Sequence, residues 1–114
     1  MAKVPPQNTD AEQSVLGALL IDKNAIIRIA DVLEHADFYN PAHAIIYKAV
    51  LSLYEKNQPI DLLTVTNSLK ESGGLEGVGG STYLTKIIDS VPTASHIDHY
   101  AKLVKEKKIL RDLI

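Results

Sequence analysis

The sequence predicts an all-α fold, a compact multi-helix bundle, and three observations support this class. Apolar residues recur at helical spacing along most of the chain. Helix-capping residues and glycine or proline stop signals separate these stretches, and none of them alternates apolar and polar residues as a strand would. The 114 residues suit one domain, and a hydrophobic content of 46% is enough for a core.

The clearest predicted helix spans residues 40–57. Asn40 is a favoured N-cap residue, Pro41 suits the first helical position, and Pro59 ends the stretch. Because apolar residues surround most of this helix, we expect it to be the central helix of the bundle. Near-complete burial is expected for Ile45, Ile46, Val50 and Leu53. The residues expected to face water are His43, Lys48, Ser52, Glu55 and Lys56.

Before this helix, residues 1–8 contain two prolines and predict an extended N-terminal arm. Thr9 and Glu12 have the spacing of a capping box, which opens a first helix. Its apolar face is Ala11, Val15, Leu16, Leu19 and Leu20. A second helix is indicated by the stripe Ile26, Ile29, Ala30 and Leu33, and Phe38 is expected to fill the core.

After Pro59, Asp61 can cap a fourth helix that ends at a pair of glycines, Gly73 and Gly74. Its inward residues are Leu62, Val65, Thr66 and Leu69. A glycine-rich loop follows, and Ser81 can cap a fifth helix that Pro92 ends. A sixth helix starts at Thr93 or Ser95 and carries the stripe Ile97, Tyr100, Ala101 and Val104.

The last helix changes character along its length. Residues 105–108 form a full polar turn, which suggests that the helix leaves the globule there. An apolar stripe then resumes with Ile109, Leu110, Leu113 and Ile114. We therefore divide the chain into an arm at 1–8, a head at 9–104 and a truncated further element at 105–114. Since the helical pattern stops without a capping signal, we expect the natural protein to continue beyond Ile114.

No motif in the chain predicts catalysis or a bound metal or cofactor. Residues 74–81 approach a phosphate-binding P-loop, but Gly80 stands where the motif needs lysine, and the loop follows a helix. A mobile connecting loop is the favoured interpretation. His96 and His99 can face one way on a helix, but zinc needs further ligands, so a solvated first turn is favoured. His43 is interpreted as a hydrogen-bonding structural residue.

Charge and composition limit the kinds of partner and cellular location that the protein can have. The net charge of −2 gives no global basic field, and there is no cysteine for a disulfide or thiolate site. The N-terminus has no apolar signal core, and no apolar run could span a bilayer, so a cytoplasmic protein without a membrane segment is expected. The final helix is locally basic through Lys102, Lys105, Lys107, Lys108 and Arg111. This segment is either a solvated face or a docking surface for an acidic partner or nucleic acid.

Four ordered groups of residues resemble one known family, the N-terminal domain of DnaB-type bacterial replicative helicases. They are residues 5–8 with 11–17, 37–39 with 43–47, 79–84, and 91–94 with 100–107. The resemblance implies a helical head followed by a long helical hairpin, of which residues 105–114 begin the first arm. It also implies that ATP hydrolysis with Mg and DNA translocation reside in a RecA-like C-terminal domain outside this chain. N-terminal domains in the family pair through the hairpin into a collar on a hexameric ring, which docks a DnaG-type primase and a helicase loader.

The predicted function is therefore a non-catalytic collar domain of a hexameric replicative DNA helicase, reaching DNA only through the full-length ring. The predicted interface residues are Leu103, Lys107, Ile109, Leu110, Leu113 and Ile114. The alternative is a free-standing helical nucleic-acid-binding module, which salt-dependent affinity for DNA would favour. A small nucleotide-binding enzyme is a third class, and it would require thermal stabilisation by nucleotide.

Overall fold

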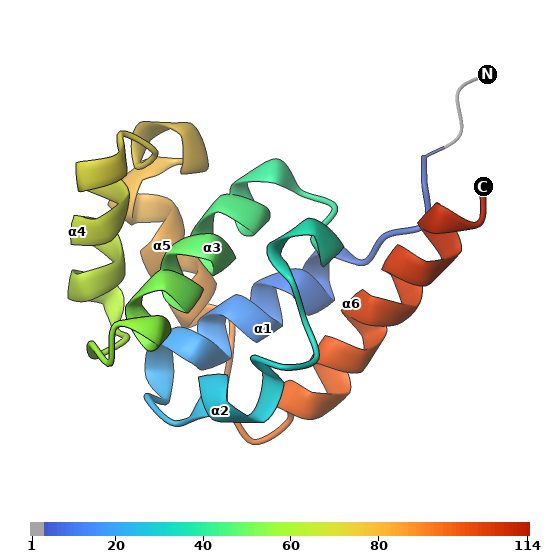
Figure 1. The fold of residues 1–114 in the computed structure, drawn as a ribbon, viewed down its shortest axis with the longest axis horizontal. Coiled ribbons are helices and arrows are strands. Elements are labelled where there is room, and N and C mark those ends of the chain that lie inside the picture. The colour runs from blue at the N-terminus through green and yellow to red at the C-terminus, as the bar shows by residue number, and fades with distance from the viewer. Residues whose placement is uncertain (1–3) are drawn as a thin grey trace.

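A computed structural model describes residues 4–114 of the protein and shows a bundle of helices (Figure 1). The α-helices are α1 (Thr9–Ile21), α2 (Ala25–Ile29), α3 (Pro41–Glu55), α4 (Leu62–Ser72), α5 (Gly80–Asp89) and α6 (Ile97–Asp112). Two short 3₁₀ turns, η1 (His35–Asp37) and η2 (Glu76–Val78), complete the fold. The described residues include no strand, so the all-α prediction is confirmed. The first three residues of the predicted arm lie outside the described part.

α1 occupies the centre of the bundle, where it packs against α2, α3, α5 and α6 (Figure 1). Small residues let these neighbours come close. A Cβ atom added at Gly17 would lie 2.4 Å from Val91 Cγ2 and 2.8 Å from the Ile87 carbonyl oxygen. The sequence had placed the helix at 40–57 in the centre. α3, the helix in that region, packs against the two helices α1 and α4, whereas α1 packs against four, so the prediction of a central α3 is corrected.

α3 has the predicted start, since the Asn40 side chain accepts a hydrogen bond from the Ala42 N–H and Pro41 opens the helix. Ile46, Val50 and Leu53 are buried as predicted. The prediction for Ile45 is wrong, because this side chain is 42% exposed. α3 packs against α1, α4, η1 and η2, and Ile45 lies toward the loop after α4, where an added Cβ at Gly74 would be 3.5 Å from its Cγ2.

Several helix ends differ from the prediction by a few residues. Asn8 caps α1 in place of Thr9, and its side chain accepts from the Ala11 N–H at 3.0 Å. α2 ends at Ile29, so the buried Leu33 belongs to the segment that follows. α5 starts at Gly80 after Gly79 with φ of 103°, which leaves Ser81 inside the helix. α6 starts at Ile97, later than either predicted cap.

Other local predictions are confirmed. Asp61 caps α4 by accepting from the Thr64 N–H, and Gly73 ends α4 in the left-handed conformation with φ of 79°. Phe38 is buried and lies 5.0 Å from the Tyr47 ring, centroid to centroid. In the loop after α4, Val78 is buried against the core, while the predicted mobility of the loop stays a prediction. No helix within residues 4–114 has the length and apolar character needed to cross a membrane.

Candidate interaction surface and its anchors

A buried polar cluster joins α1 to the start of α3. Glu12 is 1% exposed, although the sequence suggested a role in a capping box. One carboxylate oxygen accepts from the Tyr39 N–H at 2.7 Å, and the other accepts from the Asn40 N–H at 3.2 Å. His43 Nδ1 lies 2.7 Å from the second oxygen. The carboxylate thus satisfies two backbone donors that precede α3, which a buried acid needs to be tolerated.

His43 extends this cluster to α5. It is fully buried, which corrects the expectation that it faces water. Its Nε2 lies 2.6 Å from the Tyr83 hydroxyl, which also accepts from Gln13 Nε2 at 3.2 Å. A carboxylate can only accept, so the ring carries a proton on Nδ1, and in the neutral ring Nε2 accepts from the tyrosine. Every ring nitrogen is engaged within the protein, which supports the structural interpretation of His43.

A second cluster holds the end of α6 against the head. Asp37, 2% exposed, pairs with Lys105 Nζ at 3.0 Å. Arg111 donates to the Asp37 carbonyl oxygen at 2.7 Å and to the Pro6 carbonyl oxygen at 2.9 Å. Its guanidinium also lies 5.6 Å from the centre of the Tyr39 ring, a cation–π arrangement. The polar turn therefore does not mark a point of separation, because these bonds keep one face of α6 on the head.

The opposite face of α6 is uncovered. Among the predicted interface residues, Leu113 is 77% exposed and Ile109 is 52% exposed, with Leu110 and Ile114 also exposed. Leu103 and Lys107 are half-buried. Beside Ile114, residues 4–6 and Arg111 border a hollow of about 570 Å³. We call Ile109, Leu110, Leu113 and Ile114 the α6 stripe. The anchors hold this end of the helix on the head and leave each of the four stripe residues at least 45% exposed.

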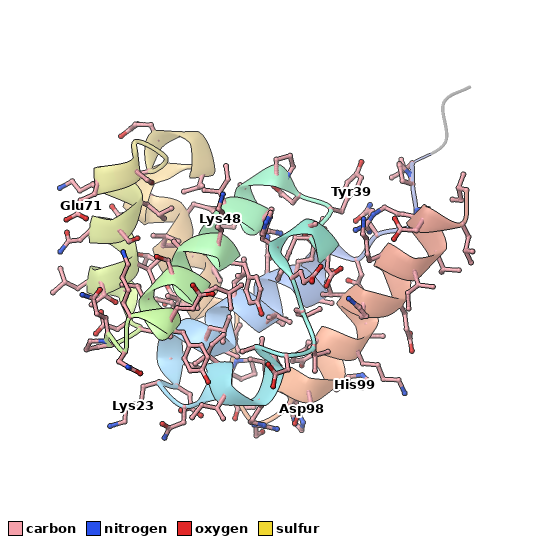
Figure 2. All side chains as sticks on the ribbon, in the orientation of Figure 1. Lys23, Tyr39, Lys48, Glu71, Asp98 and His99 are labelled. Carbon is pink, nitrogen blue, oxygen red and sulfur yellow. The ribbon has the colours of Figure 1, made fainter. Side chains whose placement is uncertain are left out.

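The basic residues of α6 are mostly engaged within the chain. Lys105 and Arg111 bind the head as described, and Lys108 pairs with Asp112 at 3.0 Å. At the start of α6, Arg28 of α2 pairs with Asp98. Figure 2 shows Asp98 and His99 on the side of the molecule where α2 meets α6. His96 and His99 are exposed, and no cluster of three or more metal-binding side chains occurs in residues 4–114.

These features define a helical domain in which part-buried polar contacts hold an exposed apolar helix end in place. The model of the DnaB-like helicase N-terminal domain family matches residues 4–106. Bacillus subtilis replicative DNA helicase DnaC is 50% identical over 112 residues, covering 98% of this chain and 25% of that protein. Geobacillus stearothermophilus replicative DNA helicase DnaB is 44% identical over 112 residues, with the same coverage of 98% and 25%. The chain therefore belongs to the DnaB-like helicase N-terminal domain family.

Solved structures agree with this assignment. The N-terminal domain of DnaB helicase from Mycobacterium tuberculosis superposes with a TM-score of 0.94 at 45% identity, covering 96% of this chain and 76% of that one. A DnaB-like replicative helicase, described with its interactions with primase, gives a TM-score of 0.82 at 28% identity. That match covers 92% of this chain and 25% of the other. The chain spans about a quarter of the length of the curated relatives it matches.

Proposed function

We propose that this chain is the collar domain of a hexameric replicative DNA helicase and that it docks a DnaG-type primase and a helicase loader. The observation that carries the proposal is the 50% identity to a replicative helicase over 98% of the chain. The solved helicase described with its interactions with primase, at a TM-score of 0.82, supports a docking role for this fold. Residues 1–8 act as an arm, 9–104 as the head, and 105–114 as the start of a helical hairpin.

The α6 stripe and the neighbouring Leu103 and Lys107 form the proposed contact with other N-terminal domains. A directed, exposed apolar stripe is typical of an association surface. Each Leu or Ile that becomes buried contributes roughly 1.5–3 kcal/mol, but association itself costs about 4–15 kcal/mol. The chain alone should therefore associate weakly. In a ring, linkage to other subunits raises the effective concentration and strengthens the same contact.

The remaining three quarters of the protein supply the chemistry in this proposal. ATP and Mg are bound there, DNA is reached only through the assembled ring, and the protein acts in the cytoplasm. We predict that the chain alone neither binds nor hydrolyses ATP, because Gly80 replaces the lysine that a P-loop needs. Calorimetric titration with Mg-ATP should give no saturable heat. Micromolar binding of ATP to this chain would contradict the proposal that nucleotide is bound only in the rest of the protein.

A chimera tests the proposal. This chain replaces the matching N-terminal segment of the Bacillus subtilis helicase, and the unaltered helicase serves as the control. The chimera should form hexamers and should co-sediment with Bacillus subtilis primase. A chimera carrying Leu110→Asp and Leu113→Asp should lose hexamer stability while the head stays folded. If the doubly substituted chimera forms hexamers equally well, the α6 stripe is not a contact of the collar. If the chimera fails to co-sediment primase, the proposed docking role is contradicted.

A further inference from the structure

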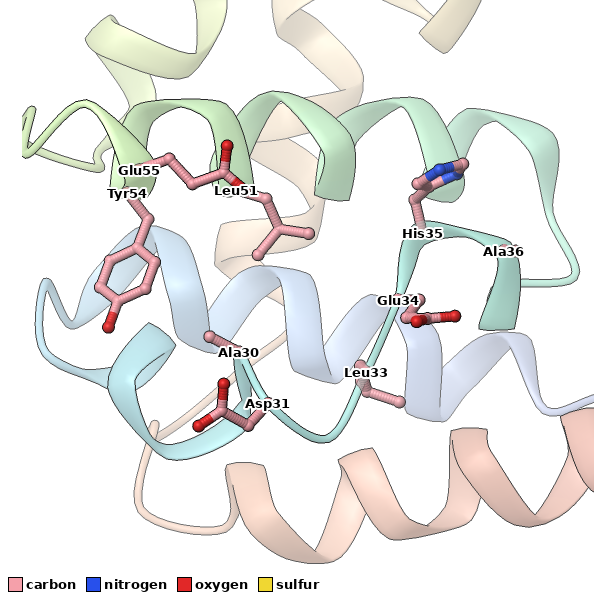
Figure 3. Close-up of a pocket in the computed structure, with 9 residues that line it drawn as sticks. All are labelled: Ala30, Asp31, Leu33, Glu34, His35, Ala36, Leu51, Tyr54 and Glu55. Carbon is pink, nitrogen blue, oxygen red and sulfur yellow. The ribbon is translucent and has the colours of Figure 1, made fainter.

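A groove separate from the α6 stripe runs between the C-terminal half of α3 and the segment that follows α2. Its volume is about 450 Å³, and we call it the acidic groove. Its lining residues are Ala30, Asp31, Leu33, Glu34, His35, Ala36, Leu51, Tyr54 and Glu55. Figure 3 shows Leu51 directed from α3 into the space, with Asp31 and Glu34 on the wall across from it and Glu55 on the α3 side.

A buried hydrogen bond ties the two walls of the groove to each other. The Tyr47 hydroxyl donates to the Leu33 carbonyl oxygen at 2.9 Å, and both side chains are buried. This bond fixes the segment of Leu33 to α3. The spacing of the two walls is therefore set by the core, and a ligand would find a preformed site.

The rim of the groove carries unbalanced negative charge. Asp31, Glu34 and Glu55 are exposed, and none of the ion pairs within residues 4–114 uses them. No lysine or arginine lines the groove, and His35 is its one basic side chain. Tyr54 also lines an adjoining hollow with Ile27, which is 63% exposed, and Lys23 stands in that hollow. Apolar surface thus continues past Tyr54 beyond the carboxylates.

We propose that the acidic groove binds a cationic amphipathic helix from a partner protein. Leu51 and Tyr54 offer an apolar floor of the kind that receives helix side chains at i, i+3 and i+4 spacing. The carboxylates pair with lysine or arginine on the flanks of that helix and steer its approach. Nucleic acid does not fit, since its phosphates would be repelled.

A second copy of this chain is a poorer occupant than a separate partner. Its basic helix is α6, but Lys105, Arg111 and Lys108 are already bound to Asp37, to backbone carbonyls and to Asp112. Docking α6 through these residues would break those bonds, and Lys102 and Lys107 are the only other lysine or arginine side chains of that helix. The groove shares no residue with the α6 stripe, so binding there can be tested independently of collar assembly.

The test titrates the ¹⁵N-labelled chain with a helical leucine–lysine amphipathic peptide, and with a leucine–glutamate peptide of the same pattern. The lysine peptide should give saturable shifts at residues 30–36 and 51–55 that weaken with salt, and the glutamate peptide should give none. Shifts centred on α6, or equal binding of both peptides, would overturn the proposal. Shifts on α6 would place the peptide outside the acidic groove. Equal binding of both peptides would show that the binding does not depend on charge.

Two triple variants each remove three negative charges, one set from the groove and the other from elsewhere on the surface. Asp31→Asn with Glu34→Gln and Glu55→Gln neutralises the groove, and Asp89→Asn with Glu71→Gln and Glu76→Gln neutralises exposed carboxylates elsewhere. The first set should weaken lysine-peptide binding about tenfold, as expected for three modest ion pairs, and the second should leave it nearly unchanged. Glu55→Lys, a single exposed change, repeats the test if the first set unfolds. Equal weakening by both triple variants would show that only net charge matters.

Discussion

α1 and α6 are both long helices with apolar residues, yet the molecule uses them differently. α1 is enclosed by four helices, and Val15 and Leu16 are fully buried. α6 buries Ile97, Ala101 and Val104 in its first half and leaves Ile109 and Leu110 exposed in its second, with Leu113 exposed just past its end. The apolar residues of α1 and of the first half of α6 therefore form the core, and those of the second half of α6 form a surface.

The two helices are also held by different forces. α1 is placed by close apolar packing around small residues such as Gly17. The end of α6 is placed by polar bonds from Lys105 and Arg111 to Asp37 and the Pro6 carbonyl oxygen. Polar anchors can hold a helix on one side without covering its apolar side. The difference shows how one chain makes a stable head and still presents an unburied stripe.

The largest effect expected from this comparison is on stability. Leu16→Ala in α1 removes a fully buried side chain and should lower the free energy of unfolding by about 2–5 kcal/mol. Leu113→Ala in α6 makes the same chemical change at a 77% exposed position and should alter it by less than about 0.5 kcal/mol. Urea unfolding of both variants measures the difference. Equal losses would show that the end of α6 belongs to the core.

A smaller effect is expected where α1 meets α5. Gly17→Ala places a methyl group 2.4 Å from Val91 Cγ2 and against the Ile87 carbonyl oxygen, so the helices must separate. We expect a loss of about 1–3 kcal/mol in thermal or urea unfolding. Gly77→Ala is the control, because its added Cβ meets no heavy atom within 4 Å. A stable Gly17→Ala protein would contradict the close packing at the centre.

The buried Tyr47, whose hydroxyl donates to the Leu33 carbonyl oxygen, should make the free energy of unfolding fall at high pH. Burial, and then the charge of Asp37, raise the pKa of Tyr47 above its usual range. The unfolded tyrosine releases its proton near pH 10, roughly its ordinary pKa, while the folded one keeps it, so stability is lost as the pH rises past that point. Tyr47→Phe should be less stable by about 0.5–1.5 kcal/mol at neutral pH and should show a shallower decline above pH ~10. Parallel pH profiles for the two proteins would contradict the buried tyrosine.

The sequence predicted the features that depend on neighbouring residues. Asn40 and Asp61 begin their helices and Gly73 ends one, as predicted, because a cap depends on only a few neighbouring residues. The pairing of Glu12 with His43 was missed, since these residues are 31 positions apart and each has an ordinary local role that hides it. Only the packing of distant helices decides that both are buried.

The error at Ile45 has the same origin. An isoleucine one residue from the buried Ile46 is equally apolar in sequence, and only the packing of the elements around α3 decides which of the two is covered. The anchors Asp37 and Arg111 were also missed as a pair, because 74 positions separate them. The interface residues proposed on α6 stay a prediction, and the exposure of Ile109, Leu110, Leu113 and Ile114 is the structural fact that supports it.

The most direct test of the account is sedimentation velocity over a range of protein concentrations. The chain should show weak, concentration-dependent self-association through the α6 stripe, and Leu110→Asp with Leu113→Asp should be monomeric throughout. Ile27→Asp with Leu63→Asp is the matched control, because it adds the same charges at exposed residues of the head and should associate like the unaltered chain. If the chain and the α6 variant both stay monomeric, or both associate equally, the stripe is not the contact and the division between α1 and α6 is contradicted.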